Sequence, residues 1–186
     1  MFELSHKNQW LVGGILLLVM LATRVHVSDH LLDASWAVFF LAGFYLRNTV
    51  SFGVFMATAM AIDYVAVNQF GVSDFCLSPA YWALVPAYGA LFVSGRWFAG
   101  QYQGETFASL GKLIIAVMAG FAVSEVISSG SFYALSGTFA EVTWGEFGAQ
   151  LLKYSPHGLY IMSLYLSTAA LLHIAVRQIK QVNTTV

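Results

Sequence analysis

The sequence predicts an all-α integral membrane protein with six transmembrane helices. Hydrophobic residues make up 59% of the 186 residues and charged residues only 9%, against roughly 45–50% and about 25% in soluble domains. The mean hydropathy is +0.72, and a helix that crosses a bilayer needs about 20 apolar residues. The chain therefore fits a single transmembrane domain over residues 1–186, with no room for a soluble second domain.

Apolar runs bounded by charged residues locate the six helices. They are expected over about 10–27, 34–46, 49–70, 81–95, 110–129 and 158–176. The run over 34–46 is short, so we expect it to be tilted, to extend past Arg47 or to be partly re-entrant. A membrane β-barrel is not favoured, because its strands alternate apolar and polar residues, whereas these runs are apolar on every face.

Charge placement predicts the orientation, because basic residues near helix ends stay in the cytoplasm. With the N-terminus inside, only Arg24 and Lys153 lie near the outer side. The other basic side chains that flank the runs then share the inner side: Lys7, Arg47, Arg96, Lys112, Arg177 and Lys180. Both termini are therefore expected in the cytoplasm. A net charge of -1 and the lack of a long basic block disfavour a nucleic-acid partner.

The connections expected on the outer side, over 71–80 and 130–157, are rich in glycine, serine and aromatic residues. Irregular backbone at membrane depth is tolerated where it lines a cavity, and polar loops with interspersed aromatics suit a concave site for a large ligand. The alternative is an interfacial belt of aromatic side chains, which membrane proteins carry whatever their function.

The lone cysteine, Cys76, falls in the first of these outer connections. A single cysteine excludes an internal disulfide. Its thiol suits either a soft ligand for a metal or a metal-containing molecule, or a small buried apolar side chain, and the residues alone leave both open.

Asp63 and Glu125 are acidic residues within predicted spans, where an ionisable group is costly and functional by default. One hypothesis is proton-coupled transport of a small solute through these two carboxylates. The other is a structural role through hydrogen bonds, with Tyr64 near Asp63 and several serines near Glu125 as expected partners: Ser124, Ser128 and Ser129.

An intramembrane enzyme is a third possibility. It would use Cys76, or Ser155 with His157, as a nucleophile with a nearby base. The five histidines form no known zinc-binding motif, so a structural zinc site is not expected.

Three segments carry a resemblance to a known family. The first predicted span ends in LATRVH, the second begins with DASWAVFFLAGFYLR (33–47), and the lone cysteine stands in SDFCLSPAYW (73–82). With six spans in a chain of this size, these residues resemble the BtuM family of bacterial cobalamin transporters, which are similar in fold to the substrate-binding S-components of energy-coupling factor (ECF) transporters. The resemblance implies binding of cobalamin (vitamin B12) on the periplasmic side and uptake across the inner membrane, with Cys76 as an axial ligand of cobalt.

Loop placement suggests which side chains would surround the corrin ring with Cys76. The candidates are Trp36, Phe75, Tyr81, Tyr133 and Phe139. Ligation by the cysteine could assist release of cyanide from bound cyanocobalamin, although a transporter rather than an enzyme is expected.

The resemblance also bears on partners other than cobalamin and the lipid bilayer. S-components usually carry an AxxxA pattern on the first helix that docks the coupling subunit, and the first predicted helix here reads GGILLLVMLA instead. The chain also lacks a Walker A motif, so any use of ATP requires another subunit. The expectation is therefore either an ECF energising module or none, as in the solitary members of the family.

Overall fold

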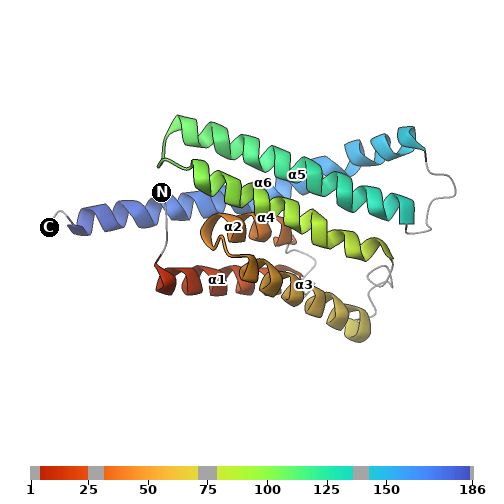
Figure 1. Cartoon of the computed structure of the whole chain (residues 1–186), viewed down its shortest axis with the longest axis horizontal. Coiled ribbons are helices and arrows are strands. Elements are labelled where there is room, and N and C mark those ends of the chain that lie inside the picture. The colour runs from red at the N-terminus through yellow and green to blue at the C-terminus, as the bar shows by residue number, and fades with distance from the viewer. Residues whose placement is uncertain (1–4, 25–31, 71–78, 136–142, 185–186) are drawn as a thin grey trace.

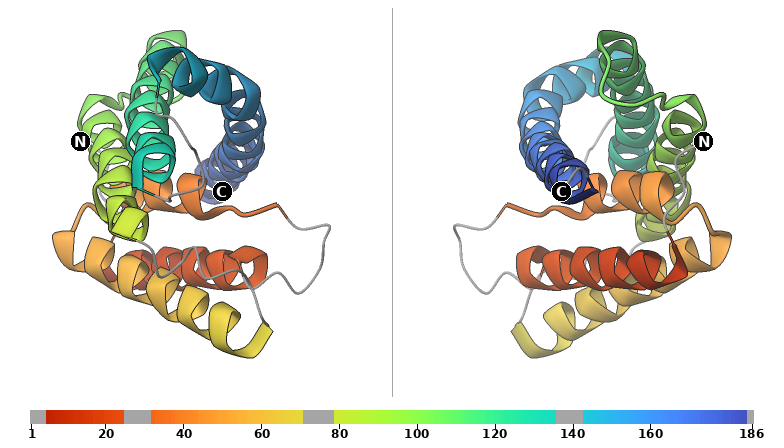
Figure 2. Two further views of the ribbon diagram at one scale, coloured as in Figure 1. Left: turned by 90° about the vertical axis from the view of Figure 1, so that its right-hand side faces the viewer. Right: turned by 90° about the vertical axis from the view of Figure 1, so that its left-hand side faces the viewer.

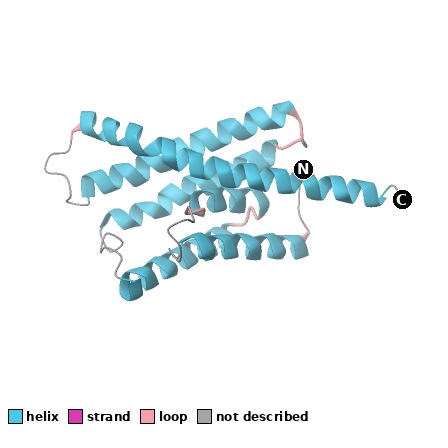
Figure 3. Ribbon diagram, turned by 180° about the vertical axis from the view of Figure 1, so that it is seen from behind, coloured by secondary structure: helices cyan, strands magenta, loops and turns pink. Residues whose placement is uncertain are grey.

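Helices make up the regular structure of the residues that the computed structural model describes, which are 5–24, 32–70, 79–135 and 143–184. Within them no strand occurs (Figure 3). Six α-helices and one 3-10 helix follow in order: α1 (His6–Arg24), α2 (Ser35–Tyr45), α3 (Thr49–Phe70), η2 (Pro79–Ala83), α4 (Leu84–Gln101), α5 (Phe107–Leu135) and α6 (Trp144–Thr184). The all-α prediction with six helices is confirmed.

The bundle has two distinct ends (Figure 1). One end, called the terminal end below, holds the start of α1, the turn between α4 and α5, and the last part of α6. The opposite end, called the distal end, holds the last turns of α3 and α5 and the first turns of α4 and α6. The start of α1 and the end of α6 therefore lie on the same side of the bundle.

Three helices are long and apolar enough to cross a membrane: Thr49–Gln69, Phe107–Leu135 and Trp144–Ile179. Large apolar side chains cover the outside of the bundle, including Trp10 at 82% exposure, Leu18 at 65% and Leu171 at 69%. Exposed apolar surface of this extent marks contact with a membrane or a partner rather than with water.

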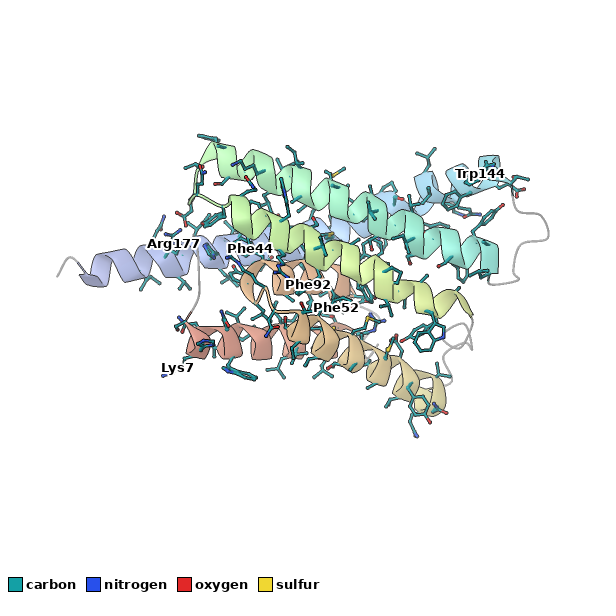
Figure 4. The ribbon with its side chains drawn as sticks, in the orientation of Figure 1. Lys7, Phe44, Phe52, Phe92, Trp144 and Arg177 are labelled. Carbon is teal, nitrogen blue, oxygen red and sulfur yellow. The ribbon has the colours of Figure 1, made fainter. Side chains whose placement is uncertain are left out.

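The short helix α2 lies at the centre of the bundle. Figure 2 shows α1 and α3 on one side of it and α4, α5 and α6 on the other. Phe39 of α2 is fully buried and stacks on Tyr88 of α4, with ring centroids 4.3 Å apart. Phe44 likewise stacks on Phe98, at 5.2 Å, and Figure 4 shows Phe44, Phe52 and Phe92 grouped where α2, α3 and α4 meet. Such aromatic pairs stabilise a core beyond the area that they bury.

Two glycines allow α2 and α4 to approach each other closely. A Cβ atom at Gly43 would lie 2.0 Å from the carbonyl oxygen of Phe92, and one at Gly95 would lie 2.0 Å from that of Phe40. Because each glycine faces the backbone of the other helix, neither contact can be relieved by turning a side chain. Small residues at helix crossings in membranes have this role.

Some predicted boundaries are wrong. The expected loop over 130–157 is largely helical, because α5 continues to Leu135 and α6 begins at Trp144. The runs over 110–129 and 158–176 likewise mark only the apolar parts of α5 and α6, and the run over 81–95 begins in η2 and ends before α4 does. Backbone hydrogen bonding continues a helix through polar residues, whereas hydropathy reports only its lipid-compatible portion.

Pro156 lies within α6 rather than before it. Proline lacks the backbone N–H and clashes with the preceding turn, and Figure 2 shows α6 curving along its length. Of the three alternatives for the second helix, extension past Arg47 is excluded. Helix α2 ends at Tyr45, and Arg47 has a left-handed φ of 56° that breaks the helix before α3 begins.

Candidate functional site

A buried ion pair lies in the distal half of the bundle. Arg24, the last residue of α1, donates from Nε to Oδ1 and from Nη2 to Oδ2 of Asp63 in α3, both at 2.7 Å. The two side chains are only 8% and 13% exposed. A bidentate pair of this kind fixes both the distance and the orientation of its two partners.

The same guanidinium reaches two further helices. Its Nη1 donates to Oγ of Ser35 at the start of α2 and to the hydroxyl of Tyr88 in α4, both at 2.8 Å. It also lies 3.5 Å from Oδ2 of Asp33. Asp33 in turn accepts hydrogen bonds from the backbone N–H and the hydroxyl of Ser35, at 2.9 and 2.6 Å. One arginine therefore joins α1, α2, α3 and α4.

Tyr81 completes this group from η2. Its hydroxyl donates to Oδ2 of Asp63 at 2.8 Å, so the carboxylate receives donors from both an arginine and a tyrosine. We refer to the set below as the Arg24 cluster: Arg24, Asp33, Ser35, Asp63, Tyr81 and Tyr88. It contains one cation and two carboxylates and thus bears a net negative charge when all are ionised.

The predicted wall residues fall into separate groups of contacts. Tyr81 belongs to the Arg24 cluster, whereas the ring of Trp36 lies 5.2 Å from that of Phe121 in α5. Tyr133 is only 4% exposed, and its hydroxyl donates to Oε2 of Glu146 at 2.8 Å. The remaining candidates, Phe75, Cys76 and Phe139, lie outside the described residues.

The structure shows the hydrogen-bond partners of the two acidic residues within the apolar helices, Asp63 and Glu125. Glu125 accepts hydrogen bonds from Ser129 at 2.8 Å and from Ser155 at 3.4 Å, which confirms the expected partnership with a nearby serine. Tyr64 was the wrong partner for Asp63, because its side chain is 66% exposed and the hydrogen bonds come from Arg24 and Tyr81 instead.

The structure does not bring Ser155 and His157 together as a catalytic pair. The Ser155 hydroxyl donates to Glu125, and His157 is exposed. Residues two apart on a helix do not face each other.

The serine hydroxyl of Ser124 is buried and makes no hydrogen bond to any described residue. It was one of the serines expected to support Glu125, and it does not do so. Ser124 is 0% exposed, so neighbouring residues cover it completely.

The described residues hold no group of three or more histidine, cysteine, aspartate or glutamate side chains that could bind a metal ion. No protein-family model and no curated protein matched this chain in sequence comparisons.

Proposed function

We propose that this protein takes up cobalamin across the bacterial inner membrane, binding the corrinoid at the distal end with Cys76 as an axial ligand of cobalt. One observation carries the proposal beyond the sequence resemblance. Described residues of all three segments that resemble the BtuM family meet at the Arg24 cluster. Arg24 comes from 21–26, Asp33 and Ser35 from 33–47 and Tyr81 from 73–82, and Asp63 of α3 joins them.

The cluster supports a binding site by holding the base of the segment that bears the cysteine. Tyr81 lies five residues after Cys76, and its hydrogen bond to Asp63 fixes η2 against α3. A thiolate is a soft donor suited to cobalt, and release of cyanide from cyanocobalamin could accompany its ligation. Trp36, Phe75, Tyr133 and Phe139 remain the proposed aromatic surroundings of the corrin ring.

The proposed orientation places the terminal end in the cytoplasm. Lys7, Arg47, Arg96, Lys112 and Arg177 lie toward that end, in agreement with the rule that basic residues stay inside. The energy source is proposed to be either an ECF module or none, since the first helix lacks the AxxxA docking pattern.

The contacts of Asp63 favour a structural role over proton coupling. Its two carboxylate oxygens are engaged by a bidentate arginine and a tyrosine, an arrangement that fixes a side chain in place. Proton-coupled transport of a small solute, and an enzyme using Cys76, remain as the outcomes that the following experiments would reveal.

Replacing Cys76 with serine tests the cobalt ligand. Purified wild-type protein incubated with cobalamin is expected to show a shifted visible spectrum, because a thiolate is a stronger donor to cobalt than water. In C76S the shift should vanish and the affinity should fall about tenfold or more, a loss of at least roughly 1.4 kcal/mol.

The matched control is Ser78→Ala, which alters the same segment and leaves the thiol in place. It should keep both the shift and the affinity. A C76S protein with wild-type spectrum and affinity would show that Cys76 is not a ligand, and failure of the wild type to bind cobalamin would remove the proposed function itself.

Labelling of the single cysteine tests the orientation. Because the chain has only one cysteine, a membrane-impermeant maleimide added to intact spheroplasts should modify Cys76, and added cobalamin should slow the reaction. A C76S chain provides the unlabelled background. Modification only after lysis would place the distal end in the cytoplasm and contradict the proposal.

A further inference from the structure

A cavity lies at the terminal end, away from the Arg24 cluster. It has a volume of about 530 Å³ and is bounded by α2, α4, α5 and α6. Most of its wall is apolar and includes Phe40, Phe44, Phe98, Leu113, Leu166 and Ala170. The volume falls within the range of roughly 300–1,000 Å³ that is typical of small-molecule sites.

Polar side chains converge at one side of this cavity. The hydroxyls of Tyr45 and Tyr102 lie 3.0 and 3.2 Å from the two ring nitrogens of His173. The Tyr102 hydroxyl also donates to Glu105 at 3.1 Å and accepts from Nη1 of Arg177 at 3.2 Å. A cavity with apolar walls and a few convergent polar groups fits a ligand with one apolar and one polar part.

Arg177 lies beside the cavity, next to the lining residues Tyr102 and Glu105, and has capacity for a further anion. Its Nη1 donates to Glu105 at 2.8 Å, whereas its Nε and Nη2 make no hydrogen bond to any described residue, and its side chain is 38% exposed. Although burial raises the pKa of Glu105, hydrogen bonds from its own backbone and Tyr102 and the charge of Arg177 bring that pKa below its usual range. Glu105 is therefore ionised at neutral pH and pairs with Arg177 while the cavity is empty of other anions.

Part of the cavity wall lies on the apolar outer surface of the bundle. Three of its lining residues are exposed apolar side chains: Phe107 at 94%, Leu110 at 50% and Ile174 at 37%. A hydrocarbon chain can enter past such residues from the bilayer without losing contact with apolar surface.

The charge of the terminal end indicates which headgroup the polar part of the ligand carries. Among the described residues, Glu105 is the only acidic side chain toward this end. Several basic side chains lie there with it, and Figure 4 shows Lys7 and Arg177 among them: Lys7, Arg47, Arg96, Lys112 and Arg177. An anionic headgroup at the membrane surface is attracted by such an excess of positive charge.

We propose that the cavity binds an anionic phospholipid, with one acyl chain between α2, α5 and α6 and the phosphate at Arg177. The lipid comes from the leaflet that surrounds the terminal end. Its binding adds to the contacts that His173 and Arg177 of α6 already make with Tyr45, Tyr102 and Glu105. This site is separate from the proposed cobalamin site and does not depend on it.

Photocrosslinking of the lipid tests the site. The full-length protein is placed in phosphatidylcholine nanodiscs that contain phosphatidylglycerol with a diazirine on one acyl chain, and crosslinked peptides are mapped by mass spectrometry. Crosslinks are expected in 107–113 and 166–174. Unlabelled phosphatidylglycerol should compete for them, whereas additional phosphatidylcholine, free fatty acid and inorganic phosphate should not.

Two variants test the two parts of the site, which are the acyl-chain cavity and the positive charge proposed to bind the phosphate. Ala170→Phe fills the cavity, and Arg177→Gln removes the charge, so each should reduce crosslinking in these peptides about tenfold, as expected for loss of a charge-assisted contact or of the acyl-chain volume. The matched controls are Leu171→Phe, on the adjacent exposed position of α6, and Arg96→Gln, an exposed arginine toward the same end. Both should retain crosslinking within about twofold of the wild type.

Folding of each variant is checked by gel filtration and thermal unfolding, and Ala170→Leu replaces Ala170→Phe if the phenylalanine variant does not fold. Equal competition by phosphatidylcholine, or displacement by fatty acid or inorganic phosphate, would overturn the proposal of an anionic phospholipid. Crosslinks spread evenly over lipid-facing positions, or unchanged in the cavity-filling variant, would overturn the site. Cobalamin binding is measured in parallel, because its loss or retention reports on the distal site alone.

Discussion

Replacing Gly43 with alanine is expected to destabilise the protein by about 3 kcal/mol or more, at the upper end of the cost of overpacking a core. The new Cβ would lie 2.0 Å from the carbonyl oxygen of Phe92 and 2.8 Å from its carbonyl carbon. Both atoms belong to the backbone, so α4 must move away from α2. That movement separates the stacked rings of Phe39 and Tyr88.

Thermal unfolding of the purified protein in detergent, followed by circular dichroism, measures this effect. Gly14→Ala is the matched control, because nothing lies within 4 Å of its Cβ position. Alanine there should be neutral or stabilise α1 by roughly 0.5–1 kcal/mol, as it does in helix interiors. If Gly43→Ala unfolds at the same temperature as Gly14→Ala, then α2 and α4 do not cross as closely as described.

The second large effect is expected at the buried ion pair. Arg24→Gln leaves Asp63 without its bidentate partner in a site where it is only 13% exposed, and breaking a buried pair in this way costs about 3–5 kcal/mol. Asp63→Asn should cost less, because the asparagine oxygen still accepts a hydrogen bond from Arg24.

A double-mutant cycle provides the control. The variant with both Arg24→Gln and Asp63→Asn should be more stable than the sum of the two single effects predicts, since the charge left unpaired at position 63 by Arg24→Gln is removed, and the remaining carboxylate, Asp33, is 40% exposed. Strict additivity in thermal unfolding would show that the two side chains do not interact.

The same variants separate structure from proton coupling. If the proposed function holds, a folded Asp63→Asn protein should retain substantial uptake of cobalamin. The same is expected of a folded Glu125→Gln protein that keeps its hydrogen bond with Ser129. A variant that folds and binds the ligand but does not transport it would support the proton-coupled alternative.

Hydropathy predicted the helices well where the apolar run and the helix coincide. The run over 49–70 matches α3, and 34–46 differs from α2 by one residue at each end. It failed at α6, because a polar first segment with Pro156 at its end resembles a loop in composition. Hydropathy does not report the backbone hydrogen bonds that make this segment helical.

The Arg24 cluster was only partly accessible from sequence. Asp63 stood out as an acid within an apolar run, but its partner lies 39 residues away in the chain, and no local spacing connects the two. A usable signal was present, since Arg24 ends an apolar run and a buried acid requires a cation. Gly43 and Gly95 were not singled out because a close crossing depends on the packing of two distant helices.

The shortness of α2 has a consequence for how the protein enters the membrane during synthesis. Eleven residues span only about 16 Å, roughly half of the hydrocarbon thickness of a bilayer. A helix of this length is too short to cross the bilayer by itself, so we expect α2 to depend on contacts with α1 and α3 until α4 has been made. Its main neighbour is α4, and the two helices cross where Gly43 of α2 and Gly95 of α4 each face the backbone of the other helix. The centre of the protein is thus completed only after the ribosome has made residue 101, when slightly more than half of the chain exists.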